Sequence, residues 1–296
     1  MKLSYRFSHY PIPGVEEVGG KAVSLMRLFQ SGHPVPPGFI LTTSFFQPWL
    51  AHLRTTQEWN DFVAADSASL AVTCTRLQGM IENRRLSTDQ HQLLAEELGR
   101  WPTDSLFAVR SSSPEEDLDR ASFAGAYTTV LGVNAVKVHA ILPAIIASSL
   151  DHRTVLYKIN RGIDPALPRL AVIIQEQVSS EISGVAFSGN PVTGDITQMV
   201  IESSWGLGAA VVEGRVSPDH FVIDKRTRTI VERRCNTGSL TEERLQALVT
   251  LVLDVEREYQ RPIDIEWAIK SGRIFLLQAR PITAHFPLEL RTPTKG

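Results

Sequence analysis

Three short stretches of the sequence carry side chains that could bind a phosphate chain and a divalent metal ion. The first is Gly19-Gly20-Lys21, where two glycines permit close backbone approach and a lysine lies in the first turn of the helix they open. Because a helix N-terminus offers unpaired N–H groups and a partial positive charge, this stretch suits an anion. It is not a Walker A loop, since Val15 and Ala22 stand where that pattern needs Gly and Ser or Thr. A plain helix start with a solvated lysine explains these residues equally well.

The second stretch is Phe107–Asp117, in which a short apolar strand delivers Arg110 and three serines to its carboxyl end. The planar fork of an arginine binds phosphate oxygens in a bidentate way. The small-residue loop Ala121–Gly125 follows and leads into a β run at 127–131, and such a loop can donate backbone N–H groups to phosphates. The alternative is a capped helix with an ordinary loop, because serine clusters are usually caps or turns.

The third stretch is Ile263–Arg280, where polar and apolar residues alternate as in a β-hairpin. Pairing Lys270 with Ile274 across a three-residue loop sets Glu266 opposite Gln278, and Asp264 then lies opposite Arg280. A two-residue loop would set Glu266 against Leu277, so the polar faces match only in the first register.

Glu266 and Gln278 side by side would offer a carboxylate and an amide oxygen, which are hard ligands that suit Mg²⁺ together with waters and phosphate oxygens. A solvent-facing hairpin with a cross-strand salt bridge is the commoner structure. Against that alternative, the other flank is apolar and favours a strand pair well inside a sheet; its residues are Ile265, Trp267, Phe275 and Leu277.

Two further glycine-bearing segments, Gly184–Gly194 and Glu202–Gly208, are expected where strands pass into loops. The second does not complete a dinucleotide fingerprint, since Val211 stands at the third glycine position. The eight histidines show no metal-ligand spacing, and no Ser or Cys lies in a nucleophile elbow.

Mixed elements must position these residues. Helical periodicity is predicted for 20–31, for most of 44–100, for 135–161 and for 242–259, and β runs are predicted at 38–41, 106–110 and repeatedly over 170–234. The pattern predicts an α+β fold with two lobes and a cleft between them. The predicted divisions are a first lobe at 1–168, a second lobe at 169–284 and a tail or linker at 285–296.

Composition narrows the function classes. The net charge of −2 provides no basic field for nonspecific nucleic-acid binding, so no nucleic-acid partner is expected. Only Cys74 and Cys235 are present, which excludes a disulfide framework and fits a reducing compartment. No apolar run approaches signal-peptide or membrane-span length, and the expectation is a cytoplasmic protein without a membrane partner.

The motifs taken together resemble the ATP-binding domain of the phosphoenolpyruvate synthase and pyruvate phosphate dikinase family, whose nucleotide fold is of the ATP-grasp type. Rifampin phosphotransferase shares that domain. The resemblance runs in order from about Gly19 to Thr283 and rests on GGKAVSLMRL, PVPPGFILTT, FAVRSSSPEEDLDRASFAGAYTTVLGV, LAVIIQEQVSSEISGVAFSGNPVTGD, ESSWGLGAAVVEGRVSPDHFVID and DIEWAIKSGRIFLLQARPIT. It implies ATP and Mg²⁺ as cofactors and phosphoryl transfer as the activity.

Carried over by position, the resemblance implies that Lys21 and Arg110 contact the nucleotide phosphates and that Glu266 and Gln278 bind Mg²⁺. Arg280 would reach the transferred phosphates and act with Lys21 and Arg110 in catalysis. The remaining implied nucleotide contacts are the covering loop Ser122, Phe123, Ala124 and Gly125 with Thr128 after it, the adenine and ribose segment Gln175, Glu176, Gln177 and Val178, and the supporting residues Glu202 and Asp264.

In the multidomain relatives, ATP phosphorylates a histidine on a separate swivelling domain. Nothing in this sequence resembles that histidine motif or the pyruvate-binding barrel. The chain is then either a piece cut after the nucleotide domain or one subunit of a split system like phenylphosphate synthase, with a histidine-bearing domain or subunit as its partner. The final small-molecule acceptor stays unidentified.

Two other functions stay open at this point. One is a self-sufficient kinase or ligase that acts on a small acceptor. The other is a non-catalytic nucleotide-binding regulatory subunit, against which the complete set Lys21, Arg110, Glu266, Gln278 and Arg280 argues.

Overall fold

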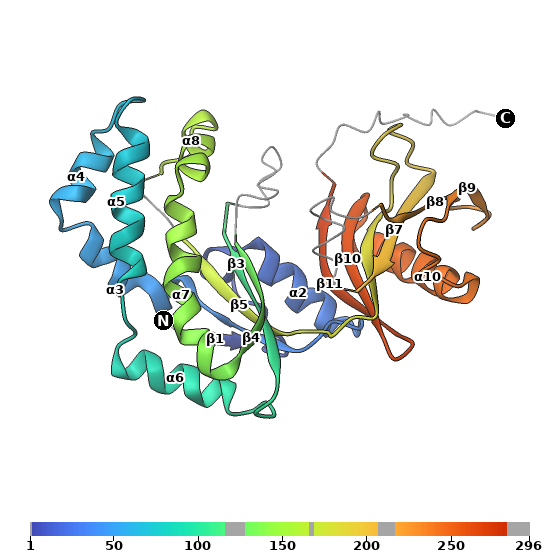
Figure 1. Ribbon diagram of the computed structural model, residues 1–296, viewed down its shortest axis with the longest axis horizontal. Coiled ribbons are helices and arrows are strands. Elements are labelled where there is room, and N and C mark those ends of the chain that lie inside the picture. The colour runs from blue at the N-terminus through green and yellow to red at the C-terminus, as the bar shows by residue number, and fades with distance from the viewer. Residues whose placement is uncertain (1, 116–127, 166–168, 207–216, 283–296) are drawn as a thin grey trace. The chain divides into compact units, whose positions relative to one another are not determined.

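The computed structural model describes residues 2–115, 128–165, 169–206 and 217–282. The chain divides into two compact units, Met1–Gln177 and Val178–Gly296, and each has its own β-sheet (Figure 1). Both units combine helices with antiparallel strands, which confirms the α+β class. The division predicted after residue 168 precedes a strand, β5 (Ala171–Glu176), that the structure places in the first sheet because it pairs with two first-unit strands. The predicted tail, 285–296, lies outside the described residues.

The first unit is built on a five-stranded sheet with the order β1-β2-β5-β3-β4. Its other strands are β1 (Ser4–Arg6), β2 (Gly38–Leu41), β3 (Leu106–Ser112) and β4 (Thr129–Asn134). Its helices are α1 (Val15–Val18), α2 (Gly20–Gln30), α3 (Thr43–Leu53), α4 (Gln57–Val63), α5 (Leu70–Glu82), α6 (Thr88–Leu98), α7 (Ala135–Ala147), the 3-10 turn η1 (Ser148–Leu150) and α8 (His152–Asn160).

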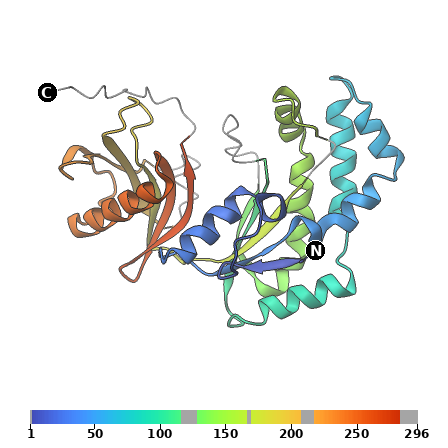
Figure 2. The ribbon, with the colours of Figure 1, turned by 180° about the vertical axis from the view of Figure 1, so that it is seen from behind.

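The two faces of this sheet pack differently. One face belongs to the main core, where Phe39, Val109 and Ile174 join buried residues of α3, α5 and α7. The opposite face bears Arg110 and packs against α2, so α2 and α7 lie on opposite sides of β3 (Figures 1 and 2). Helix α2 ends as its sequence predicts, with Gly32 at φ +83°, a backbone conformation that glycine adopts without strain. The face shared by α2 and β3 therefore holds Lys21 and Arg110.

The second unit is a six-stranded antiparallel sheet with the order β11-β10-β6-β7-β8-β9, covered on one face by a long helix (Figure 2). Every second residue of β10 from Ile263 to Ile269 is fully buried, and the same alternation runs through β7 and β8. Its elements are β6 (Ile182–Phe187), β7 (Gln198–Trp205), β8 (Asp219–Asp224), β9 (Ile230–Arg234), α10 (Glu242–Tyr259), β10 (Ile263–Lys270) and β11 (Arg273–Pro281).

A buried carboxylate organises the connection between β9 and α10. The Asp219 side chain is fully buried and accepts six hydrogen bonds from the backbone and side-chain donors of residues 236–239. Burial would raise the pKa of Asp219, but the amides and hydroxyls of Thr237 and Ser239 outweigh burial and hold that pKa below its ordinary value. Asp219 is thus a structural anchor of the second unit.

We expect Asp219→Ala to lower the free energy of unfolding of the second unit by at least roughly 3 kcal/mol, because charge-assisted hydrogen bonds are lost and buried donors are left unsatisfied. A depressed folded pKa stabilises the native state above the unfolded pKa of about 3.9, and this contribution is lost as the pH falls below about 4. Urea unfolding between pH 3 and pH 7 measures both effects. Asp224→Ala, at a half-buried aspartate, is the control on the same strand, and equal losses in the two variants would contradict the anchor role.

No helix among the described residues is both long enough and apolar enough to cross a bilayer.

Candidate functional site

Strand β3 delivers the first unit's predicted arginine to a buried position. Arg110 is 7% exposed and pairs with Ile173 of β5, on the face that packs against α2. Ser112 lies two residues further on the same face, at the end of β3. Arg110 and Ser112 thus share the face of β3 against which α2 packs.

Gly19 and Gly20, at the start of α2, lie against the end of β3. Gly19 has φ +78°, and a Cβ at this position would overlap the Ser112 backbone and hydroxyl. The Gly20 amide donates to the Ser113 carbonyl at 3.1 Å, and the Ala22 amide donates to Ser112 Oγ at 3.1 Å. The expectation of unpaired amides at this helix start is therefore wrong at Gly20 and Ala22, because the end of β3 already occupies them. Gly19 thus lets the start of α2 approach the end of β3.

This close approach brings Lys21 to β3, the strand that carries Arg110. Lys21 Nζ donates to the carbonyl of Ser111, the residue that follows Arg110, at 3.1 Å. The ammonium group therefore lies at the carboxyl end of β3. Thr128 lies here as well, since its carbonyl accepts from the Ser111 amide at 3.2 Å and from Ser111 Oγ at 3.3 Å. The first unit thus brings Lys21, Arg110 and Thr128 to one strand end. The predicted loop residues Ser122, Phe123, Ala124 and Gly125 lie outside the described residues.

The predicted adenine and ribose segment runs along the end of β5 and across the unit boundary. The Gln175 side chain is 2% exposed and donates to the Pro36 carbonyl at 3.3 Å. The Glu176 amide donates to the Pro37 carbonyl, and Gln177 Oε1 accepts from the Gly132 amide. Val178 is the first residue of the second unit, where its carbonyl accepts from the Ser180 amide.

In the second unit, the hairpin has the predicted polar pairs, but its loop length and its register near the loop differ from the prediction. Glu266 lies opposite Gln278 and Asp264 opposite Arg280. The loop has two residues, Ser271 and Gly272 with φ 50° and 74°, as in a type I′ turn, and Lys270 pairs with Arg273.

A β-bulge beyond Glu266 restores the register, since Trp267 pairs with Leu276 and Leu277 is the extra residue. The predicted three-residue loop and the predicted core position of Leu277 are therefore wrong. Leu276 is the fully buried residue, and β11 is an edge strand rather than an interior one.

Polar side chains form a row across one face of this sheet. Directly paired residues of adjacent antiparallel strands share a face, and the pairs run from Gln278 to Glu266, Val185, Glu202 and His220. This is the face opposite Ile263, Ile265, Trp267 and Ile269 of β10, and no helix covers it within the described part of the second unit. The candidate metal ligands therefore lie on the face of the sheet that α10 leaves uncovered.

His220 is a polar residue of this row that the sequence did not single out. Its Nδ1 lies 3.3 Å from Glu202 Oε1, across β7 and β8. The alternation in the run HFVID shows which residues share a face with His220 on its own strand. It does not show which residue of β7 lies opposite His220, because the length of the intervening connection sets that register.

Arg280 is held by the carboxylate opposite it. Its Nε lies 2.8 Å from Asp264 Oδ2, and its Nη2 lies at 2.8 Å from the same oxygen. Burial raises the pKa of the Asp264 carboxyl, Arg280 opposes that rise, and Glu266 adds to it. Asp264 thus orients Arg280. This pair lies on the same face of the hairpin as Glu266 and Gln278, two residues further along each strand.

The side chains of Glu266 and Gln278 suit a Mg²⁺ ion whose remaining ligands are waters and phosphate oxygens. The two side chains lie opposite each other, Gln278 is 8% exposed, and Glu266 is half-buried. Among the described residues, no group of three or more His, Cys, Asp or Glu could hold a metal ion. One carboxylate and one amide would leave most of the coordination shell to waters and phosphate oxygens, as is usual for Mg²⁺ in nucleotide sites.

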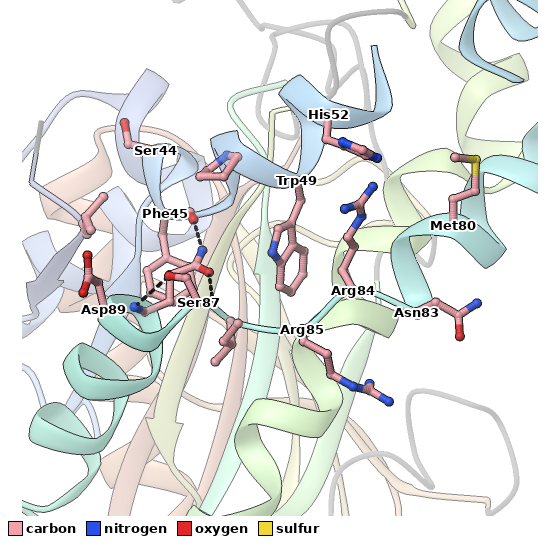
Figure 3. A pocket seen from close by; sticks show the side chains of 14 residues that line it. Ser44, Phe45, Trp49, His52, Met80, Asn83, Arg84, Arg85, Ser87 and Asp89 are labelled. Atoms are coloured by element: carbon pink, nitrogen blue, oxygen red, sulfur yellow. Dashed lines mark hydrogen bonds between the residues drawn. The ribbon is translucent and has the colours of Figure 1, made fainter. Parts of the chain in front are cut away.

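A cavity of about 930 Å³ lies elsewhere in the first unit, between α3 and the connection from α5 to α6 (Figure 3). Trp49, His52 and Arg84 are among the residues that line it. None of the residues predicted to bind nucleotide or metal lines this cavity, so it is separate from the set at the end of β3.

The family model and the curated relatives agree with the motif pattern. The family model of the pyruvate phosphate dikinase AMP/ATP-binding domain matches residues 15–239 and 232–289. The chain is 29% identical to a probable phosphoenolpyruvate synthase of Methanocaldococcus jannaschii, over 91% of this chain and 26% of that protein. It is 30% identical to rifampicin phosphotransferase of Bacillus subtilis, over 92% of this chain and 35% of that protein. The D-alanyl-alanine synthetase A structure from Vibrio cholerae matches with a TM-score of 0.32 and 13% identity, over 71% of this chain and 54% of that one.

The chain thus spans about a quarter to a third of the length of these two curated relatives. The family model, in contrast, covers most of this chain and includes both units. The chain belongs to the family of pyruvate phosphate dikinase AMP/ATP-binding domains.

Proposed function

We propose that this chain binds Mg·ATP and is the nucleotide-binding component of a phosphotransferase that passes a phosphoryl group to a histidine on a separate domain or subunit. The observation that carries the proposal is the polar end of the hairpin, where Glu266 lies opposite Gln278 and Asp264 holds Arg280 beside them. A carboxylate, an amide and an oriented arginine on one face of the sheet suit a metal-bound polyphosphate.

In this proposal the first unit supplies cations for the phosphates. Lys21 and Arg110 lie at the carboxyl end of β3, and the bond from Lys21 Nζ to the Ser111 carbonyl directs the ammonium there. Arginine and lysine stabilise the charge that spreads over phosphoryl oxygens during transfer. Gln175 to Val178, at the end of β5, would contact the adenine and ribose, and Glu202 would support the nucleotide from β7.

Mg²⁺ would be held by Glu266 and Gln278 and would supply charge neutralisation for the phosphates. Arg280, oriented by Asp264, would bind the phosphoryl group that is transferred. Catalysis in this account is positioning and charge stabilisation, because the chain's own residues need form no covalent bond to the phosphoryl group.

The acceptor is proposed from the resemblance and from the names of the relatives. One is named a probable phosphoenolpyruvate synthase and another rifampicin phosphotransferase, and both are about three to four times as long as the part that this chain matches. A histidine on the remaining part of such a protein, or on a partner subunit, would receive the phosphoryl group and pass it to a small acceptor.

Removal of Lys21 tests the phosphate assignment. A charge-assisted hydrogen bond contributes about 1.5–3 kcal/mol, so we expect Lys21→Ala to weaken ATP binding by roughly ten- to a hundredfold while the melting temperature changes little. Titration calorimetry with Mg·ATP measures this, and Lys137→Ala, on the exposed side of α7, is the control. A sharp fall in melting temperature with unchanged ATP affinity would make the lysine structural.

A further inference from the structure

A buried ion pair lies directly beside the end of β3. Lys158 Nζ of α8 lies 2.7 Å from Glu115 Oε2, and the side chains are 1% and 8% exposed. Glu115 follows β3 by three residues, and neither member of the pair is among the residues predicted to bind nucleotide or metal. The pair therefore has no role in the function described so far.

Stability alone is a poor explanation for this pair. Removing two charges from water is costly, and a buried ion pair often contributes no more to stability than two apolar side chains of similar size. What a buried ion pair adds is a constraint on position, because each desolvated charge must stay close to the other. The pair therefore fixes where Glu115 lies relative to α8.

Glu115 in turn is tied to the strand end that carries the phosphate residues. Its amide donates to Ser113 Oγ at 3.2 Å, and the Ser113 carbonyl accepts from the Gly20 amide at 3.1 Å. The two preceding serines continue the attachment, since Ser112 Oγ accepts from the Ala22 amide and the Ser111 carbonyl accepts from Lys21 Nζ. Three successive residues at the end of β3 thus bond to three successive residues at the start of α2.

Both described residues that flank the segment 116–127 are anchored at the same place. On one side lies Glu115, held by Lys158, and on the other lies Thr128, whose carbonyl is bonded to Ser111. A displacement of Glu115 would be passed through Ser113 to Gly20 and from there to Lys21. The ion pair is the point at which α8 limits that displacement.

We propose that Lys158 is a positioning residue, which acts through Glu115 to fix the carboxyl end of β3 against the start of α2 and so sets the placement of Lys21 relative to Arg110. The proposal rests on the proposed function in one respect, namely that these two cations bind the phosphates of ATP. The placement itself is a property of the first unit and can be measured without nucleotide.

The test replaces the ion pair by an apolar pair of similar size, Lys158→Met with Glu115→Leu. The expected melting temperature is close to that of the wild type, because apolar packing substitutes for the pair. Hydrogen exchange at the Gly20 and Ala22 amides is expected to become at least about tenfold faster relative to Ile173 and Ile174 of β5, whose amides report opening of the whole unit. Mg·ATP affinity is expected to fall by roughly tenfold, as for one weakened charged contact.

The control is the more exposed pair Arg6 and Glu97 in the same unit, replaced as Arg6→Met with Glu97→Leu, which should change neither exchange nor affinity. Unchanged exchange at Gly20 and Ala22 in the Lys158 and Glu115 double variant would overturn the proposal. If the wild-type chain bound no ATP, the proposed function would be wrong. The exchange measurement needs no nucleotide and would still test whether Lys158 is a positioning residue.

A second variant covers the case in which the apolar pair does not fold. Glu115→Gln keeps the shape of the side chain and weakens its contact with Lys158. Exchange at Gly20 and Ala22 should again accelerate more than at Ile173 and Ile174. Equal acceleration at all four amides would show that the pair serves stability alone, and the proposal would be wrong.

Discussion

Glu266→Ala is expected to reduce the affinity for ATP in the presence of Mg²⁺ by at least about a hundredfold, which corresponds to roughly 2.7 kcal/mol. Glu266 would be the one carboxylate of the proposed metal site, and without it the metal loses its charged link to the protein. The fold should survive, because the side chain is half-buried and lies on the face of β10 opposite the fully buried Ile265 and Trp267. Gln278→Ala should act in the same direction and less strongly.

Calorimetric titration of ATP at saturating Mg²⁺ measures this effect, with circular dichroism as the check on folding. Glu243→Ala, on the exposed start of α10, removes the same charge from the same unit and should leave the affinity unchanged. A folded Glu266→Ala protein with wild-type affinity would refute the assignment of Glu266 to the metal.

The second large effect concerns the acceptor. We expect this chain, incubated with ATP labelled at the β or γ position, to carry no stoichiometric acid-labile phosphate. The histidine that receives the group is proposed to lie on another domain or subunit, and hydrolysis by water alone should be slow. Supplying such a domain in trans should yield phosphohistidine on that domain and not on this chain.

Phosphate mapping by mass spectrometry under neutral conditions separates the outcomes. Stoichiometric phosphohistidine on this chain would favour a self-sufficient kinase over the split system. The candidate positions are His9, His33, His52, His91, His139, His152, His220 and His285. Direct phosphorylation of a small acceptor by this chain alone would lead to the same conclusion.

The hairpin shows which parts of the site the sequence can predict. Alternation placed Asp264 and Glu266 on one face and matched them with Arg280 and Gln278, and the structure confirms these pairs. The predicted three-residue loop was wrong. The structure has a two-residue turn and a bulge at Leu277, which together give the same pairing at the site. Matching polar faces fixes the pairing at the site, but it does not locate an extra residue between the site and the turn.

The start of α2 shows the opposite case. The sequence indicated the helix, and its glycines suggested a ligand close to the backbone. The structure places the end of β3 there instead, and Ser112 and Ser113 take the amides of Ala22 and Gly20. Local sequence indicates that something approaches a glycine closely, but it does not identify the neighbour when that neighbour lies about ninety residues away.

Elements with strong periodicity were predicted well. Helix α10 has the predicted bounds of 242–259, and the strands of 170–234 were found in order except β9. Strand β9 lies at the sheet edge with most of its residues exposed, and β1 has three residues, so neither buries enough apolar side chains to leave a pattern. The ion pair between Lys158 and Glu115 was also missed, because a lysine on an amphipathic helix is most often exposed.

The most direct test of the account is calorimetric titration of the wild-type chain with ATP, once at saturating Mg²⁺ and once with the metal removed by EDTA. We expect one ATP to bind per chain with Mg²⁺ and the affinity to be at least about tenfold lower without it, since the metal would link the phosphates to Glu266 and Gln278. No binding of ATP, or the same affinity in both titrations, would contradict the account.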